Sequence, residues 1–165
     1  MKIGLRNLKA QDRKPLERML AGILSFDPED RTLAMELIDI ALEQADQVDY
    51  SFILATNEED QPVGYTCYGP TPLTASTFDL YWIAVDPLCT GQGIGTLLLK
   101  AVEKGVQSRN GRMLLIETSS CQAYEQTCYF YLKKGYTLAE TIRDFYRQGE
   151  DRLTFIKHFS PDGCD

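Results

Sequence analysis

The sequence predicts an α/β fold with one mixed sheet of about seven strands and about four helices on its faces. Apolar runs of strand length and apolar stripes at helical spacing both occur along the chain. Short polar turns join the first strands, which is typical of antiparallel pairing. The run 77–85 then enters a glycine-rich turn, a helix and another apolar run, which is the pattern of a parallel crossover.

A short strand and two helices are expected before residue 50. Residues 3–8 form the strand, and Asp12 is placed to cap the first helix. The apolar stripe of that helix comprises Leu16, Met19, Leu20, Ile23 and Leu24. The second helix starts at Asp27 and Pro28, because a capping carboxylate followed by proline favours a helix start. Its apolar stripe comprises Leu33, Leu37, Ile40 and Ala41.

Three strands follow, over residues 51–56, 63–68 and 77–85, separated by a polar turn at 57–61 and a proline-rich break at 69–72.

The second half of the chain continues the alternation. A helix is expected over 93–109, a buried strand over 113–118 and a helix over 122–134 that stops at Gly135. Two final strands, 136–147 and 152–159, flank a polar turn and should pair as a hairpin.

The composition is that of a soluble globular domain. The 165 residues are 44% hydrophobic and 25% charged, which is ordinary for one domain. We expect residues 1–165 to form a single domain. No apolar run reaches the roughly 20 residues that a membrane helix needs, and the N-terminal residues lack a signal-peptide core. These features predict a cytoplasmic protein without a membrane partner.

Acidic side chains are concentrated in the first half of the chain. Residues 1–85 hold 14 acidic and 7 basic side chains, whereas residues 86–165 hold 10 of each, which gives the formal net charge of −7. This balance argues against sequence-independent nucleic-acid binding. An acidic N-terminal half would attract a cationic partner, although a solvated surface explains the same pattern.

The cysteine and histidine content argues against a metal site. The chain has one histidine, His158, and its five cysteines show no C-x-x-C spacing. The cysteines are Cys67, Cys89, Cys121, Cys128 and Cys164. We expect free thiols and no bound metal, with Cys89 as a loop thiol and His158 as surface or core filler.

The most informative stretch is residues 85–96, V-D-P-L-C-T-G-Q-G-I-G-T. Gly91, Gly93 and Gly95 lie between the strand 77–85 and the next helix. Glycines allow a tight turn whose backbone N–H groups converge at a helix N-terminus. Such a turn predicts a site for a phosphorylated ligand.

Three kinds of phosphate-binding turn compete for this stretch. A P-loop is excluded because no lysine follows the glycines. A Rossmann turn fits poorly, since Thr96 stands where its last glycine belongs, although Glu117 lies at the distance of a ribose-binding acid. The strands before the turn also look like a meander and not a βαβ array. The third kind is an acyl-CoA loop.

The stretch resembles the acyl-CoA loop of the GNAT N-acyltransferase superfamily, [RQ]-x-x-G-x-[GA], commonly embedded as V-x-P-x-x-R-G-x-G-I-G. The matching residues are Val85, Pro87, Gly91, Gly93, Ile94 and Gly95. Thr90 departs from the pattern, because the family usually has arginine or glutamine there. Residues 129–136, Y-F-Y-L-K-K-G-Y, resemble the second family signature, F-Y-x-x-x-G-[FY]. The resemblance implies a GNAT-like fold whose sheet is splayed in the middle.

The resemblance also implies that acetyl-CoA is the co-substrate. The pantetheine arm would bond the main chain of Ile83 and Val85, with the thioester near Ile83 and Ala84 and a backbone N–H polarising its carbonyl. The pyrophosphate would lie on the amides of residues 91–96. The cofactor-binding residues so implied are Ile83, Ala84, Val85, Thr90, Gly91, Gln92, Gly93, Ile94, Gly95 and Thr96.

The reaction that the resemblance implies is direct acyl transfer from the sulfur of CoA to an amine. Tyr131 occupies the position of the family's tyrosine acid, although Tyr124, Cys128 and Tyr131 also share a helix face on which a tyrosine would pack. Asp79, where relatives often carry a glutamate base, and Glu117 are the two candidates for the base. Each is otherwise a solvated or paired carboxylate.

The expected function is therefore acetyl-CoA-dependent N-acetylation of a primary amine on a small molecule or peptide. The alternatives are a non-catalytic acyl-CoA-binding module, which needs neither Tyr131 nor Asp79, and a generic nucleotide-binding domain. Pairing through the last strands would give a homodimer. Four tyrosines could line an aromatic cleft that binds a cationic amine, and the alternative is that they pack along strand faces. They are Tyr50, Tyr65, Tyr68 and Tyr81.

Overall fold

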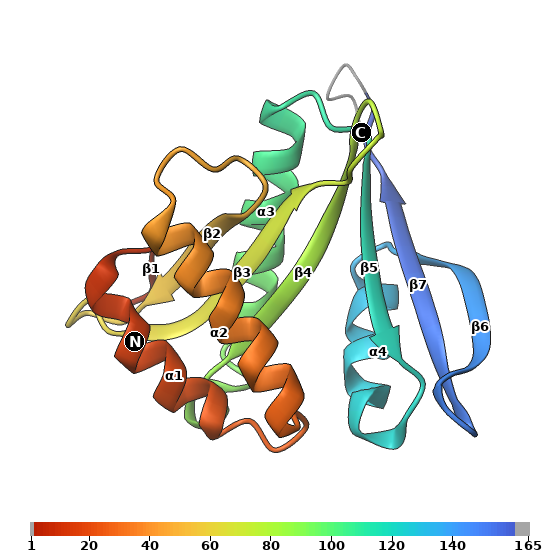
Figure 1. Ribbon diagram of the computed structural model, residues 1–165, viewed down its shortest axis with the longest axis horizontal. Coiled ribbons are helices and arrows are strands. Elements are labelled where there is room, and N and C mark those ends of the chain that lie inside the picture. The colour runs from red at the N-terminus through yellow and green to blue at the C-terminus, as the bar shows by residue number, and fades with distance from the viewer. Residues whose placement is uncertain (1, 161–165) are drawn as a thin grey trace. The chain divides into compact units, whose positions relative to one another are not determined.

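The computed structural model describes residues 2–160 of the chain. Its seven strands form one sheet in the order β1-β2-β3-β4-β5-β7-β6 (Figure 1). The strands are β1 (Gly4–Arg6), β2 (Ser51–Thr56), β3 (Pro62–Pro70), β4 (Thr77–Val85), β5 (Met113–Ser119), β6 (Thr137–Arg147) and β7 (Glu150–His158). The α-helices are α1 (Arg13–Ala21), α2 (Pro28–Glu43), α3 (Ile94–Ser108) and α4 (Glu125–Lys133). The predicted α/β fold with one mixed sheet is confirmed.

Two compact units can be distinguished within the chain. The first unit holds the residues up to Gly69 together with Tyr81–Gly105, and the second holds Pro70–Leu80 together with the residues from Val106 onward. Strand β4 and helix α3 each contribute residues to both units. That residues 1–165 act as one domain stays a prediction. None of the helices within residues 2–160 is long and apolar enough to cross a membrane.

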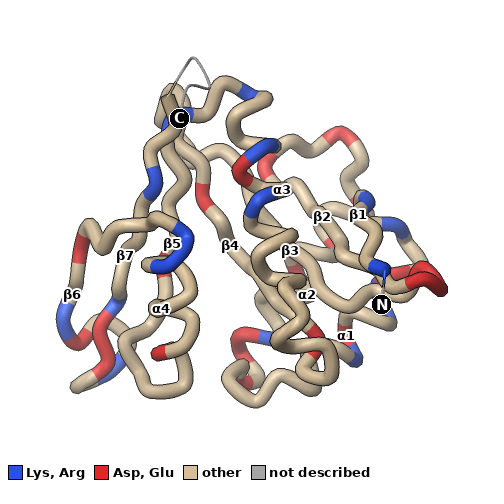
Figure 2. The backbone as a smooth tube through the Cα atoms, turned by 180° about the vertical axis from the view of Figure 1, so that it is seen from behind, with Lys and Arg blue, Asp and Glu red and all other residues tan. Residues whose placement is uncertain are grey.

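The first unit packs helices on both faces of its strands. β1 pairs with β2 and β2 with β3, in both cases antiparallel. Views from opposite sides show α1 and α2 on one face of these strands and α3 on the other (Figures 1 and 2). A side-chain carbon on Gly64 of β3 would lie 2.9 Å from the carbonyl oxygen of Ala84 and 3.2 Å from the side chain of Ile94. Glycine therefore lets β3, β4 and α3 approach one another closely.

The two predicted helix starts have different outcomes. Asp27 caps α2 as predicted, because its carboxylate accepts a hydrogen bond from the Asp30 N–H at 2.8 Å while the Asp30 carboxylate accepts one from the Asp27 N–H at 3.0 Å. The prediction for Asp12 is wrong: its side chain makes no cap bond to α1. The buried Asp12 carboxylate accepts hydrogen bonds from Arg6 and from the Lys9 N–H instead.

Some predicted boundaries and stripes also need correction. The buried face of α2 is Ala34, Leu37 and Ile38, whereas Leu33 is 51% exposed. In the first helix Leu24 is exposed, because α1 already ends at Ala21. β3 extends two residues into the predicted break at 69–72 and ends at Pro70, since a proline at the end of a strand loses no ladder bond that the strand needs.

The strands β2 and β4 have the predicted bounds. The predicted helix over 122–134 is divided into a 3-10 turn, Gln122–Tyr124, and α4. Gly135 ends α4 as predicted: it has φ +84°, and the Tyr136 N–H donates to the Tyr131 carbonyl at 3.1 Å. β7 begins at Glu150, two residues before the predicted start, because Arg147 and Glu150 already pair across the hairpin.

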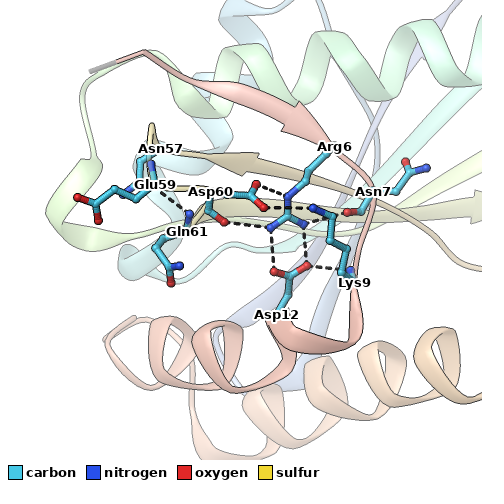
Figure 3. A network of polar contacts seen from close by, with 8 residues as sticks. All are labelled: Arg6, Asn7, Lys9, Asp12, Asn57, Glu59, Asp60 and Gln61. Atoms are coloured by element: carbon cyan, nitrogen blue, oxygen red, sulfur yellow. Dashed lines mark hydrogen bonds and ion pairs between the residues drawn. The ribbon is translucent and has the colours of Figure 1, made fainter.

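An ionic network joins β1 to the segment before α1 and to the turn between β2 and β3 (Figure 3). The Arg6 guanidinium donates to both oxygens of Asp12, at 2.7 and 2.9 Å, and also to Asp60. Lys9 donates to Asp60 at 3.1 Å. The hydrogen bonds from Arg6 and Lys9 hold the pKa of Asp60 below its usual value. This contribution to stability is therefore present above the unfolded-state pKa and is lost as the pH falls.

Replacing Arg6 by glutamine is expected to lower the free energy of unfolding by about 3 kcal/mol, because Asp12 would remain buried without its cation. The side chain of Asp12 is only 2% exposed, which makes an unpaired carboxylate costly there. Chemical denaturation measures the change. Arg13→Gln is the control, since its ion pair with Asp39 lies at the surface and should matter far less. Equal effects of the two substitutions would contradict this role of Arg6.

The second unit contains the parallel strand pair and the hairpin that the sequence predicts. β4 pairs with β5 in parallel over Thr77–Leu80 and Met113–Ile116. β5 pairs with β7, and β7 with β6, both antiparallel. Helix α4 packs on one face of these strands through Tyr131, whose ring centre lies 5.8 Å from that of Phe155.

Candidate functional site

The glycine turn between β4 and α3 is open and depends on glycine at two positions. Gly91 has φ +78° and Gly93 has φ +79°, in the left-handed region that side chains disfavour. A side-chain carbon on either glycine would meet no atom within 4 Å. The backbone of this turn is therefore uncovered, as a site for a ligand requires.

The N-terminus of α3 supplies hydrogen-bond donors to the same turn. The Gly93 carbonyl accepts the first bond of the helix, from the Leu97 N–H at 3.0 Å. The N–H groups of Ile94, Gly95 and Thr96 consequently have no partner within the helix. The chain has no lysine or arginine between Asp86 and Lys100. This segment itself therefore offers an anion its amides and the helix dipole and no basic side chain.

Local hydrogen bonds fix the entry to the turn. The Asp86 N–H donates to the Val63 carbonyl at 2.9 Å, and the Asp86 carboxylate accepts from the Leu88 N–H at 2.9 Å. Thr90, at the position where the family pattern has arginine or glutamine, donates its hydroxyl to the Pro87 carbonyl at 3.1 Å. Thr90 thus closes the turn but brings no charge to it.

The strand β4 is anchored on both of its faces before it reaches the turn. Ile83 and Val85 pack against a buried cluster, while Trp82 meets Phe26 edge-to-face at 5.2 Å between ring centres. Ala84 between them is buried. The cluster consists of Ala55, Val63, Ile94 and Leu98, and it also holds the first turn of α3. The same side chains therefore position Ile83–Val85 and the glycine turn.

In the second unit, Tyr131 is buried in an aromatic cluster. It is 2% exposed, and its ring centre lies 5.9 Å from that of Tyr136 and 5.8 Å from that of Phe155. Burial raises the pKa of Tyr131 above its ordinary value. The phenol therefore keeps its proton at neutral pH, which is the state that a proton donor needs.

The two candidate bases share one face of the second unit's strands. Asp79 pairs with Leu115, and Glu117 is two residues further along β5, so that both side chains point to the same side. Ile116 and its partner Phe155 point to the other side, which α4 covers. Asp79 is half-buried and accepts a hydrogen bond from the Thr71 hydroxyl at 2.6 Å. Glu117 is 47% exposed and lies 3.6 Å from Arg152.

Comparison with known proteins identifies the family. Residues 49–138 match the family model of the acetyltransferase (GNAT) domain. The chain belongs to the GNAT acetyltransferase family. A GNAT-family protein from Desulfovibrio desulfuricans has a crystal structure that is 36% identical in sequence, with a TM-score of 0.91 over 95% of this chain and 99% of that one. The GNAT resemblance of both sequence signatures is thereby confirmed.

Two further similar proteins are more distant or only partly covered. An uncharacterized N-acetyltransferase, MJ1530 from Methanocaldococcus jannaschii, is 33% identical over 46% of this chain, and the match spans only 47% of that relative's length. The PaiA N-acetyltransferase from Thermoplasma acidophilum, whose structure was determined with coenzyme A, is 18% identical. Its TM-score is 0.73 over 96% of this chain and 100% of that one, which shows the shared fold.

The GNAT scaffold here includes functional candidates that the sequence alone does not reveal. Thr71 contacts Asp79, and Arg152 lies between Glu117 and Glu140. Thr71 lies in the loop between β3 and β4 and folds back onto β4, whereas Arg152 meets Glu117 and Glu140 through the register of β5, β7 and β6. Gly64 could have been suspected, because a glycine inside a strand often marks close backbone approach.

The four tyrosines proposed for an aromatic cleft have different surroundings. Tyr65 and Tyr68 are 0% and 6% exposed and belong to the core, so they do not line a cleft. Tyr50 and Tyr81 do lie together, with ring centres 5.5 Å apart.

The cysteines within residues 2–160 are free thiols, as predicted: Cys67, Cys89, Cys121 and Cys128. Cys164 lies outside the described residues. Burial raises the pKa of Cys89, so this loop residue is a protonated thiol at neutral pH.

Proposed function

We propose that the protein is an acetyl-CoA-dependent N-acetyltransferase that transfers the acetyl group directly to a primary amine of a small molecule or peptide. The observation that carries the proposal is the glycine turn at the N-terminus of α3, where Gly91 and Gly93 adopt the left-handed region and a side-chain carbon on either would meet no atom within 4 Å. Membership of the GNAT acetyltransferase family supports acetyl-CoA as the ligand.

The residues present fit this co-substrate. The amides of Gly91–Thr96 would hold the pyrophosphate, and the main chain of Ile83, Ala84 and Val85 would hold the pantetheine arm. Gln92 lies in the same exposed turn, and Thr90 keeps the turn closed. Acetyl-CoA, when bound, supplies an acetyl thioester, and an N–H of β4 would polarise its carbonyl.

The proposed chemistry uses Tyr131 and a carboxylate in separate roles. Asp79, oriented by the Thr71 hydroxyl, would take a proton from the acceptor ammonium, so that the free amine can form the new C–N bond as the C–S bond breaks. Tyr131 would give its phenol proton to the departing sulfur and regain one as the amide nitrogen loses its second proton. Glu117 is the other candidate for the base.

Asp79→Asn is expected to lower kcat by about 100-fold, because the amide cannot accept the proton. Glu117→Gln tests the other candidate on the same strand face: with Asp79 as the base, its kcat should stay within a few-fold of the parent, and any change should fall on the KM for the amine. The reverse pattern would assign the base to Glu117.

The transfer itself is tested by measuring CoA release and acetylated product with a broad panel of amines. The panel should include polyamines, amino acids, aminoglycosides and peptides with free N-termini. The proposal predicts one CoA per acetylated amine. Binding of acetyl-CoA without product from any amine would favour a non-catalytic acyl-CoA-binding module, and competition by ATP would favour a generic nucleotide site.

We also infer a setting for this activity. The acidic balance of the chain favours a cationic acceptor over nucleic acid. The free thiols fit a reducing, cytoplasmic location. β6 is an exposed strand at the edge of the sheet, so a homodimer would pair through it.

A further inference from the structure

One face of the second unit carries a row of polar side chains across three strands. Glu117 of β5 lies opposite Thr154 of β7, and Thr154 lies opposite Glu140 of β6. Residues directly opposite each other in antiparallel strands point to the same side of a sheet. Thr154 is therefore flanked by two carboxylates on the face away from α4.

Arg152 occupies the same face, two residues before Thr154 along β7. Its guanidinium lies 3.6 Å from the Glu117 carboxylate and 3.3 Å from that of Glu140, and 4.6 Å from the centre of the Phe145 ring. Both ionic contacts are longer than the 2.7–2.9 Å typical of strong charged hydrogen bonds. The four polar side chains carry a net charge of −1, so the cluster attracts a further cation.

Two buried polar atoms in this cluster have no partner among residues 2–160. Thr154 is 5% exposed and its Oγ1 is unpaired, as is Nε of Arg152. Buried polar groups are nearly always hydrogen-bonded, and valine would fill the space of Thr154 without this cost. An oxygen atom that accepts from the Arg152 Nε–H and bonds the Thr154 hydroxyl would satisfy both groups.

We propose that this cluster recognises the acceptor of the transfer described above, and that the acceptor is a cationic amine with a neighbouring hydroxyl group. The ammonium would be attracted to Glu117 and Glu140, while the hydroxyl oxygen would meet Arg152 and Thr154. A zwitterionic amino acid fits less well, because its carboxylate would lie beside two glutamates. The inference rests on the proposed function for the identity of the ligand as acceptor. Asp79, the proposed base, shares this face.

The test uses two amines of equal size, 1-amino-2-propanol and isobutylamine, which differ by a hydroxyl in place of a methyl group. Each is titrated into the ¹⁵N-labelled protein, and the amide shifts of β5 and β7 are followed. The parent is expected to bind 1-amino-2-propanol about tenfold more tightly. Thr154→Val should abolish this preference while melting no lower than the parent. Glu140→Gln should weaken the binding of both amines and keep the preference.

Thr66→Val is the matched control, because Thr66 is also buried with an unpaired Oγ1 but has no role in this cluster. It should leave the preference unchanged. Equal affinities in the parent, a preference that survives Thr154→Val, or shifts confined to other strands would each overturn the inference. The titration needs no turnover, so its outcome is independent of the proposed function: an inactive protein that still prefers the hydroxylated amine would refute the transferase proposal alone.

Discussion

Replacing Tyr131 by phenylalanine is expected to lower kcat by about 10²–10⁴-fold, the range for loss of a positioned proton donor. The substitution removes one hydroxyl and keeps the ring that packs on Tyr136 and Phe155. Affinity for acetyl-CoA should stay the same, because the proposed binding groups are backbone atoms of the glycine turn and β4. Steady-state kinetics with a reactive amine, together with calorimetric titration of acetyl-CoA, measure the two effects separately.

Tyr136→Phe is the control for loss of a buried hydroxyl beside Tyr131. Both tyrosines are 2% exposed, yet only Tyr131 has a proposed chemical role. Burial raises the pKa of Tyr131, so its hydroxyl should stay protonated and active well above the pH at which an exposed tyrosine ionises. The parent should therefore show no alkaline loss of kcat up to about pH 10. An unchanged kcat in Tyr131→Phe would remove this residue as the acid.

Gly93→Trp is expected to weaken acetyl-CoA binding by at least about 100-fold, because a bulky side chain would cover the amides that bind the pyrophosphate. The φ of +79° also disfavours any side chain at this position. The space around the glycine is open, so the fold should persist with reduced stability. Calorimetric titration and thermal melting give the affinity and the stability of the same sample.

Gly149→Trp provides a matched control. Gly149 has φ +81°, and a side-chain carbon there would also meet no atom within 4 Å. It lies in the turn between β6 and β7 and has no part in the proposed co-substrate site. The two variants should lose similar stability, but only Gly93→Trp should lose affinity. Equal losses of affinity would show that the effect is general destabilisation.

The elements of the fold could be predicted from the sequence where local signals agree. The strand 77–85 was bounded by prolines and a glycine turn, and Asp27 with Pro28 set the start of α2. The prediction that Asp12 caps α1 was wrong because an aspartate that caps a helix and one that forms an ion pair look the same in sequence. Its partner, Arg6, lies in a strand whose position depends on tertiary pairing. The predicted buried stripe of α2 was partly wrong because apolar spacing defines only the average direction of the buried face, and a rotation of the helix by one residue fits the same spacing.

The proposed co-substrate site was predictable because its donors are contiguous in the chain. Residues 83–96 are consecutive, and glycine spacing alone indicates the turn. The cluster of Glu117, Glu140, Arg152 and Thr154, proposed to bind the acceptor, was not predictable, since its members meet only through the register of β5, β7 and β6. β6 contains two irregularities, after Leu138 and after Ile142, that no sequence pattern indicates. A shift of one residue would turn Glu140 to the other face.

The central claim is that the glycine turn is the pyrophosphate site of acetyl-CoA. The most direct measurement is an amide-resolved NMR titration of the ¹⁵N-labelled protein with acetyl-CoA, compared with ATP as a nucleotide without pantetheine. The account predicts that acetyl-CoA shifts the amides of Gly91–Thr96 most strongly and those of Ile83–Val85 as well, and that ATP binds far more weakly. Unchanged amide signals in the glycine turn at saturating acetyl-CoA would contradict it.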